Sequence, residues 1–308
     1  MKKHKIVTLT INPSLDKSTH FSGLIAEQKM RCEKPRYDAG GGGINVSKAI
    51  AKLGGSSVCV FTSGGSAGEM LAELIQKEAI ENIAISTKTW TRENFIAFDN
   101  KTQAQYRFGF PGNELSAEEQ AILFKTILEL DAEYLVISGS LNEGLPTDFY
   151  KKIAEIAKSS GTKVVVDTSG EALQKVLETG VYVIKPNIGE LAKLIRVARL
   201  ELDEVEKAAQ SLIEKGNAEI VVVSLGADGA ILVSKAETHL IKAPKAEKKS
   251  TVGAGDSMVG GMVWALSQDK TLKEVIQIGV CCGTAATMNE GTQLFKKEDV
   301  MRLLATMQ

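Results

Sequence analysis

Short runs of β-branched and aliphatic residues alternate with helical patterns along most of this 308-residue chain. The runs resemble strands that are buried on both faces. Strands that alternate with helices indicate an α/β fold, with a mostly parallel central sheet flanked by helices. The predicted strands are residues 6–11, 58–61, 134–138, 163–167, 181–185 and 220–224, and the clearest helices are residues 44–53, 68–78, 117–130, 147–158 and 204–215.

Local signals mark the ends of some of these helices. Ser116 with Glu119, and Asp203 with Glu206, have the spacing of a capping box, in which the two side chains satisfy the free N–H groups of a helix start. Gly216 suits a helix C-terminus. These residues predict two helix starts and one helix end.

Two stretches interrupt the alternation. Residues 16–38 show no clear helical pattern, and residues 95–110 carry aromatic side chains on both sides of Asp99 and Asn100, which suggests a hairpin. We expect the two stretches to form a small accessory sheet outside the main one. The length allows two domains or one large α/β unit with an insertion.

The composition excludes several classes of protein. Lys plus Arg is 37 and Asp plus Glu is 38, so the net charge of −1 argues against binding that relies on nucleic-acid phosphates or anionic lipid. A few local cations could still hold an anionic small molecule. None of the four cysteines forms a C-x-x-C pair and the three histidines are isolated, so zinc, thioredoxin-like and Ser/His/Asp sites are disfavoured.

The N-terminus is basic, but the apolar stretch after it is short and lacks a small-residue cleavage site. We therefore predict a first strand there and no secretory signal. No window holds 18 consecutive apolar residues, so we expect no transmembrane helix. A chain of this length needs no disulfides, and a reducing cytoplasm fits its cysteine content.

The glycines gather in three clusters. Residues 40–43 precede a predicted helix, residues 226–229 follow a strand, and residues 253–256 open another helix. Glycine allows a ligand to approach the backbone closely, and the free N–H groups of a helix start attract anions. Each cluster alone is either an ordinary turn or a binding site for phosphate or sugar oxygens.

The known nucleotide motifs narrow this choice. The chain contains no Gly-Lys dipeptide, which excludes a P-loop, and no G-x-G-x-x-G follows the first strand, which disfavours nicotinamide binding. Asp256 at the third cluster is either a helix cap or a general base beside an anion hole. As a base it would accept a hydroxyl proton while the N–H groups of Ala254, Gly255 and Asp256 hold phosphate oxygens.

At this point the sequence resembles the ribokinase-like (phosphofructokinase B) family of carbohydrate kinases over essentially its whole length. Eight family-like segments occur in the family order, which makes chance agreement negligible. They are Asn12-Pro13-Ser14-Leu15-Asp16, residues 40–46, Trp90-Thr91-Arg92, Ser138-Gly139-Ser140-Leu141, residues 185–190, Ser224-Leu225-Gly226, residues 251–256 and Asn289-Glu290-Gly291-Thr292.

Within the family the chain looks most like the enzymes that act on fructose 6-phosphate. Relatives that act on fructose 1-phosphate or tagatose 6-phosphate usually carry Lys where this chain has Gly42. The resemblance implies that ATP phosphorylates the 1-hydroxyl of fructose 6-phosphate to give fructose 1,6-bisphosphate in glycolysis. The alternatives are a tagatose-6-phosphate kinase, a 1-phosphofructokinase, and a sugar-phosphate sensor without catalytic activity.

The resemblance also implies roles for single residues. Asp256 would be the general base, with Gly253, Ala254 and Gly255 forming the anion hole. The residues implied for the sugar are Asp16, Gly41, Gly42 and Asn45, and those for its 6-phosphate are Lys29, Arg92 and Ser140.

Further residues are implied for the nucleotide and for cations. Asn187 and Glu190 would organise Mg²⁺ through water, which suits an ion that keeps much of its hydration. A monovalent cation, K⁺, would lie at Ser250, Val252, Ala286, Asn289 and Gly291, where Gln293 replaces a frequent Arg. The residues implied for ATP are Lys185, Asn187, Ser224, Gly226, Gly229, Thr251, Val280, Gly283 and Thr284.

Asp167 and the accessory sheet complete the expectations. Asp167 ends a strand at the edge of the sheet where ligands bind, and it either acts near the phosphates or caps the next helix. We expect one ribokinase-like domain, residues 1–308, with a discontinuous β lid formed by about 16–40 and 90–111. An exposed lid sheet is prone to aggregation, so we predict a homodimer in which the lids cover each other.

Overall fold

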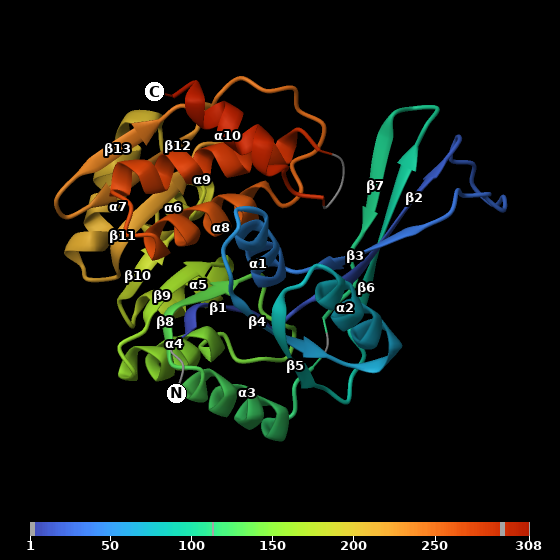
Figure 1. Ribbon diagram of the computed structural model, residues 1–308, viewed down its shortest axis with the longest axis horizontal. Helices are drawn as coiled ribbons and strands as arrows, with labels where there is room; N and C mark the ends of the chain where they lie inside the picture. The colour runs from blue at the N-terminus through green and yellow to red at the C-terminus, as the bar shows by residue number, and fades with distance from the viewer. Residues whose placement is uncertain (1–3, 113, 290–292, 308) are drawn as a thin grey trace.

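The computed structural model describes residues 4–112, 114–289 and 293–307. Within these residues, nine strands form a main sheet in the order β13-β12-β11-β10-β9-β8-β1-β4-β5 (Figure 1). Neighbours from β11 to β5 are parallel, whereas β12 pairs antiparallel with β11, and β13 pairs antiparallel with β12. The strands are β1 (His4–Thr10), β4 (Val58–Ser63), β5 (Glu81–Ser86), β8 (Ala132–Ser138), β9 (Lys163–Asp167), β10 (Val181–Ile184), β11 (Ala218–Ser224), β12 (Ala230–Ser234) and β13 (Thr238–Ile241).

Helices cover both faces of the main sheet (Figure 1). One buried cluster packs α1, α8, α9 and α10 on one face, and another packs α3 to α7 on the other. The α/β fold with a mostly parallel sheet is confirmed. The helices are α1 (Gly42–Lys52), α2 (Gly65–Lys77), α3 (Ala117–Glu129), α4 (Phe149–Ser159), α5 (Gly170–Leu177), α6 (Ile188–Leu194), α7 (Val205–Glu214), α8 (Ala254–Ser267), α9 (Leu272–Thr287) and α10 (Lys297–Ala305).

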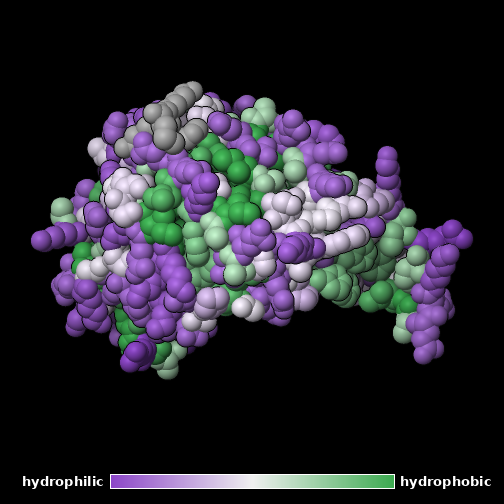
Figure 2. Space-filling model, turned by 90° about the horizontal axis from the view of Figure 1, so that it is seen from below, coloured by the Kyte–Doolittle hydropathy of each residue, from purple (hydrophilic) through white to green (hydrophobic). Residues whose placement is uncertain are grey.

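A second sheet projects from one side of this body (Figure 1). Its order is β3-β2-β6-β7, with β2 and β6 parallel and the other two pairs antiparallel. The expected hairpin in residues 95–110 is present as β6 and β7. The strands are β2 (Ser14–Phe21), β3 (Arg36–Gly40), β6 (Arg92–Asp99) and β7 (Ala104–Phe108). Figure 2 shows this sheet as a thin projection with a hydrophilic outer end.

The helix ends agree with the sequence in two places and differ in one. Ser116 and Glu119 form the predicted capping box, and Gly216 has a φ of 74° directly after α7. The capping box predicted for Asp203 and Glu206 is wrong, because a 3₁₀ turn (Leu202–Glu204) begins earlier and its box is formed by Glu201 and Glu204. Among the described residues no helix is long and apolar enough to span a bilayer.

Candidate active site

Asp256 lies in the first turn of α8, where the N-cap is Gly253 with a left-handed φ of 72°. Its Oδ2 accepts a hydrogen bond of 2.8 Å from Asn45 Nδ2 on α1. Burial and the nearby charge of Asp167 raise the pKa of Asp256 to about 6, against the opposing effects of Asn45 and Lys185. A carboxylate with this pKa, fixed at a helix start, has the properties of a general base that works near neutral pH.

Lys185 follows β10 and is buried, and its Nζ lies 3.0 Å from Asp167 Oδ1 at the end of β9. Burial opposes the charge of Lys185, but the carboxylates of Asp167, Asp256 and Glu190 raise its pKa. A Cβ atom at Gly255 would lie 3.5 Å from this ammonium, so the start of α8 faces Lys185. The N-cap of α5 is Ser169, so Asp167 is not the cap of that helix.

Asp16 on β2 is held by one residue of its own strand and one residue of the neighbouring β6. Its Oδ1 accepts hydrogen bonds from Ser14 Oγ at 2.7 Å and from Asn94 Nδ2 at 2.8 Å. Burial raises the pKa of Asp16, while these two bonds and the charge of Arg92 counteract the rise. A Cβ atom at Gly40 would lie 2.5 Å from Asp16 Oδ2, so a glycine at this position leaves room for the carboxylate.

The turn into α1 places backbone and an amide beside these carboxylates. Gly41 has a φ of 130°, a conformation that favours glycine, and a Cβ atom at Gly42 would lie 2.4 Å from Ser138 Oγ. Asn45 is buried, and in the described part of the chain its Oδ1 has no hydrogen-bond partner. That oxygen is therefore available to accept a bond from a ligand hydroxyl.

The three residues expected at a sugar phosphate are not all together. Arg92 at the start of β6 donates to the carbonyl oxygens of Asn12 at 3.2 Å, Pro13 at 3.3 Å and Phe110 at 3.4 Å. Ser140 lies close by, because its Oγ accepts from Asn12 Nδ2. Lys29 instead is exposed in residues 22–35, at the end of the small sheet opposite to Arg92.

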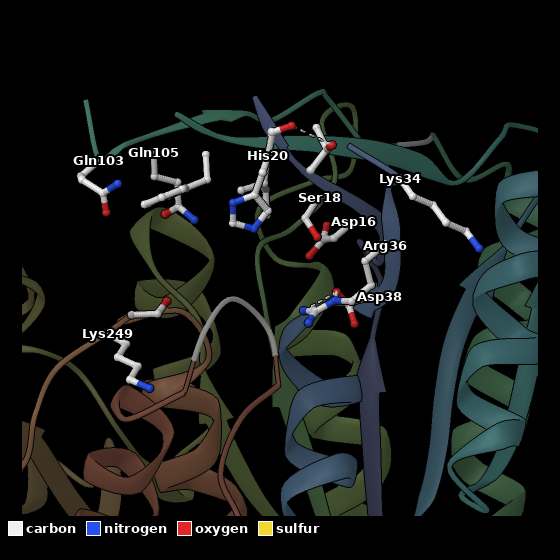
Figure 3. A pocket seen from close by; sticks show the side chains of 13 residues that line it. Asp16, Ser18, His20, Lys34, Arg36, Asp38, Gln103, Gln105 and Lys249 are labelled. Carbon is white, nitrogen blue, oxygen red and sulfur yellow. Dashed lines mark hydrogen bonds and ion pairs between the residues drawn. The ribbon is translucent and has the colours of Figure 1, made fainter. Parts of the chain in front are cut away.

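A cavity of about 500 Å³ lies between the inner face of the small sheet and the loop before α8. Figure 3 shows the side chains of Asp16, Ser18 and His20 from β2, with Lys249 on the opposite side. Alternate residues of a strand share one face, so these three residues line the same wall. A cavity of this size suits a small phosphorylated ligand. The other lining residues include Lys34, Arg36, Asp38, Gln105 and Ser250.

Residues missed from the sequence surround the predicted ones. Ser14 and Asn94 orient Asp16, and the role of Asn94 depends on the register of β2 with β6. The register places Asp38 and Asn94 on either side of Asp16, and Arg36 forms an ion pair of 2.8 Å with Asp38. Alternation along the strands could have suggested this shared face, but the strand pairing was not predicted.

The residues expected to bind the nucleotide come together at the carboxyl ends of the strands. Ser224 forms a bridge with Asn187, so the ends of β11 and β10 lie side by side. Gly226 and Gly229 have φ values of 63° and 103° in the turn after β11. On α9, a Cβ atom at Gly283 would lie 3.2 Å from the Ala254 carbonyl oxygen, so α9 contacts the start of α8. The remaining predicted residues are Thr251 before α8, and Val280 and Thr284 on α9.

The predicted cation residues have local structural roles as well. Asn187 and Glu190 form the capping box of α6, with two reciprocal bonds of 2.9 Å. In the described part of the chain no three His, Cys, Asp or Glu side chains are close enough to hold a metal by themselves.

For the monovalent cation, the Ser250 N–H donates to the Thr287 carbonyl at 3.2 Å and the Asn289 N–H to the Ala286 carbonyl at 3.3 Å. The loop that carries Ser250 and Val252 therefore lies against the end of α9. Gly291, predicted for the same site, lies outside the described residues.

We compared the chain with known protein families, curated proteins and solved structures. The model of the pfkB family carbohydrate kinases matches residues 7–299. ATP-dependent 6-phosphofructokinase isozyme 2 of Escherichia coli K12 is 40% identical over 303 residues, which cover 98% of each chain. A solved structure of Escherichia coli phosphofructokinase-2 in complex with potassium has a TM-score of 0.94 and 40% sequence identity to this chain. A structure of the same enzyme in complex with fructose-6-phosphate has a TM-score of 0.93 and 38% identity. Each covers 98% of this chain and 99% of the other.

Proposed function

The chain belongs to the pfkB family of carbohydrate kinases, and we propose that it transfers the γ-phosphoryl group of ATP to the 1-hydroxyl of fructose 6-phosphate. The observation that carries this proposal is the Asp256 carboxylate, fixed by Asn45 at the start of α8 beside Lys185. A sugar hydroxyl and a phosphate can meet at this point, because Asn45 also has a free acceptor that faces no described partner. The 40% identity to a 6-phosphofructokinase supports the choice of sugar.

In the proposed reaction the oxygen of the sugar 1-hydroxyl attacks the γ-phosphorus of ATP, and Asp256 accepts the proton of that hydroxyl. The bond between the γ-phosphorus and the bridging oxygen of ADP breaks, and fructose 1,6-bisphosphate and ADP leave. The N–H groups at the start of α8 and the Lys185 ammonium stabilise the phosphoryl charge. Asp16 and Asn45 hold sugar hydroxyls, which positions the acceptor for attack. ATP lies along Ser224, the turn at residues 226–229 and α9.

We further propose that Mg²⁺ and K⁺ assist this reaction. The carboxylates of Glu190, Asp167 and Asp256 all raise the pKa of Lys185. This region therefore offers the hard oxygen ligands that Mg²⁺ prefers. The protein alone has too few ligands for a complete magnesium site. Glu190 and Asn187 would therefore hold the ion through water, and oxygens of ATP would complete its coordination. Mg²⁺ would neutralise phosphate charge. K⁺ would lie among oxygens of Ser250, Val252, Ala286 and Asn289 and support the nearby anion hole.

The experiment that tests the function is a kinase assay with ATP over a panel of acceptors: fructose 6-phosphate, tagatose 6-phosphate, fructose 1-phosphate and fructose. We expect the highest kcat/KM with fructose 6-phosphate. A preference for fructose 1-phosphate or tagatose 6-phosphate would select one of the alternatives. ATP-dependent turnover of any acceptor would exclude a sugar-phosphate sensor, whereas binding without turnover would support one.

The structure supports fructose 6-phosphate over those two alternatives at Gly42. The family resemblance implies that relatives acting on fructose 1-phosphate or tagatose 6-phosphate usually carry Lys at that position. Here a side chain at residue 42 would meet Ser138 Oγ at 2.4 Å and the Gly139 nitrogen at 2.7 Å. The end of β8 would have to move before a Lys could enter, so this chain is shaped for glycine at the position.

Arg92→Ala is expected to raise KM for fructose 6-phosphate by about tenfold or more, because a charge-assisted bond to a phosphate contributes about 1.5–3 kcal/mol. The kcat should change little, since the 6-phosphate is remote from the reacting hydroxyl. Steady-state kinetics with both substrates will check this split. A fall in kcat at unchanged KM would contradict the placement of Arg92 at the phosphate.

We also propose that the small sheet, with the segments of about 16–40 and 90–111, acts as a lid and pairs with the lid of a second copy. The residues Leu24, Ile25, Phe108 and Phe110 are each more than half exposed there. On the face away from the cavity Phe95 stacks on Phe108 at 6.0 Å. A second copy would cover this apolar surface, and closure of the lid would exclude water from the reaction.

Size-exclusion chromatography with light scattering is expected to give a dimer at micromolar concentration. A double variant that makes the outer face polar, Phe95→Ser with Phe108→Ser, should shift the protein to a monomer. A stable wild-type monomer would contradict the proposal. One structure of Escherichia coli phosphofructokinase-2 is a tetrameric, inhibited form, so the mass is measured with and without ATP.

A further inference from the structure

The residue Asn12 connects the two side chains that we place at the sugar phosphate, although it has not been given any role so far. It lies between β1 of the main sheet and β2 of the small sheet, and it is buried. Its backbone carbonyl accepts a bond of 3.2 Å from Arg92 Nη2. Its side-chain Nδ2 donates a bond of 3.0 Å to Ser140 Oγ. Asn12 is therefore hydrogen-bonded to both Arg92 and Ser140.

The direction of the bond to Ser140 matters for binding an anion. A serine hydroxyl has one proton to donate and two lone pairs to accept with. Because Ser140 Oγ accepts from Asn12, its own proton remains free for another acceptor. A phosphate group offers only acceptors to a serine, so it needs the hydroxyl in this orientation.

The side-chain oxygen of Asn12, Oδ1, indicates that packing alone does not explain an asparagine at this position. Its Oδ1 is buried without a partner among the residues that the structure describes. A Cβ atom at Gly112 would lie 2.2 Å from that oxygen, so the segment returning from β7 to α3 packs directly on the amide. An unpartnered buried acceptor costs free energy, and an apolar residue would avoid this cost if the position served packing alone.

We propose that Asn12 is a positioning residue for the phosphate of the acceptor sugar. It sets the Ser140 hydroxyl as a donor and holds Arg92 next to it through the backbone carbonyl. This inference rests on the proposed function, because it assumes that the acceptor carries a phosphate near Arg92 and Ser140. The side chain itself need not touch the substrate.

The test measures the dissociation constant of fructose 6-phosphate by titration calorimetry, without turnover, together with KM and kcat. Asn12→Ala should weaken binding by about fivefold, the effect of one neutral hydrogen bond, with kcat and KM for ATP nearly unchanged. Asn12→Asp should weaken it by about 50-fold or more, because the Ser140 hydroxyl would donate its hydrogen bond to the new carboxylate, which also repels the phosphate. If Asn12 served packing alone, Asn12→Asp, which keeps the size and shape of the side chain, would not weaken fructose 6-phosphate binding more than Asn12→Ala does.

A double-mutant cycle with Ser140→Ala tests whether Asn12 acts through Ser140. Once Ser140 lacks its hydroxyl, adding Asn12→Ala should change the dissociation constant by less than about twofold. Asn217→Ala is the matched control, because its amide donates at 3.1 Å to the Leu177 carbonyl in another part of the fold. It should lower the melting temperature without affecting sugar-phosphate binding.

The outcomes separate the inference from the function that it rests on. If wild type binds fructose 6-phosphate but Asn12→Asp binds it equally well, or the two Ala effects simply add, the positioning role is overturned. If both Asn12 variants lose ATP affinity in parallel with sugar-phosphate affinity, the role is structural and the inference fails. If wild type binds no phosphosugar at all, the proposed function fails and the inference falls with it.

Discussion

Asp256→Asn is expected to lower kcat by at least ~100-fold, with little change in KM for ATP. The substitution keeps the size of the side chain and an oxygen that can accept from Asn45 Nδ2, so the start of α8 should keep its shape. It removes the group that takes the hydroxyl proton during attack. Steady-state kinetics with saturating fructose 6-phosphate and varied ATP will measure both constants.

An exposed acid at another helix start provides the control. Asp203 lies in the 3₁₀ turn before α7 and is exposed, so Asp203→Asn should leave kcat unchanged. Near-full activity of Asp256→Asn would remove Asp256 from the role of base. A large rise in its KM for ATP would indicate that the variant disturbs the nucleotide site instead.

The pKa of Asp256 adds a pH test of the same role. Since the pKa is raised to about 6, the kcat of wild type should fall about tenfold per unit as the pH drops below about 6. The folded state holds this proton more tightly than the unfolded state does. The contribution of Asp256 to the free energy of unfolding therefore decreases as the pH rises from about 4 to about 6, and stays low above that. Asp256→Asn should thus gain stability relative to wild type above pH 6, but not near pH 4.

The main sheet was predictable because its strands are short apolar runs separated by helical patterns. Three strands were missed: β5 has a mostly exposed or half-buried sequence, β13 is a short edge strand, and β12 is a short buried apolar run that was not recognised. The two segments of the small sheet were noticed, but the parallel pairing of β2 with β6 joins residues far apart in the chain. The hydrogen bond from Asn94 to Asp16 depends on that pairing, so local patterns do not reveal it, whereas the bond from Ser14 joins residues two positions apart on β2.

The site residues show the same division between local and long-range information. The resemblance marked Asp256, Asn45 and Asp16; the structure joins Asn45 to Asp256 by a hydrogen bond and places Asp16 in the wall of the cavity. Lys29 was marked in the same way, yet it lies at the far end of the small sheet in this chain. Family motifs carry the identity of a residue but not its distance from the others. Asn187 and Glu190 were marked for Mg²⁺, and the structure shows that they form the capping box of α6, which the sequence analysis did not predict.

Lys185→Met is expected to lower kcat/KM for ATP by about 100- to 1000-fold, the range seen when one preorganised donor to a developing charge is lost. The Lys185 ammonium faces the start of α8 and is paired with Asp167 at 3.0 Å. The variant should also lose about 3–5 kcal/mol of stability, because a buried carboxylate is left without its partner. Denaturant unfolding and steady-state kinetics will measure the two effects separately.

A second substitution separates the structural effect of Lys185 from its catalytic one. In the double variant Lys185→Met with Asp167→Asn, the carboxylate that formed the 3.0 Å ion pair with Lys185 is removed as well, so most of the lost stability should return while the activity stays low. Asp167→Asn alone should lower the pKa of Asp256, because the charge of Asp167 raises it, and so shift the acid limb of the kcat profile to lower pH. The solvent-screened pair of Lys151 and Glu178 is the control: Lys151→Met should change the stability little and leave kcat unchanged. Recovery of activity together with stability in the double variant would show that Lys185 only neutralises Asp167, and would remove it from the phosphate site.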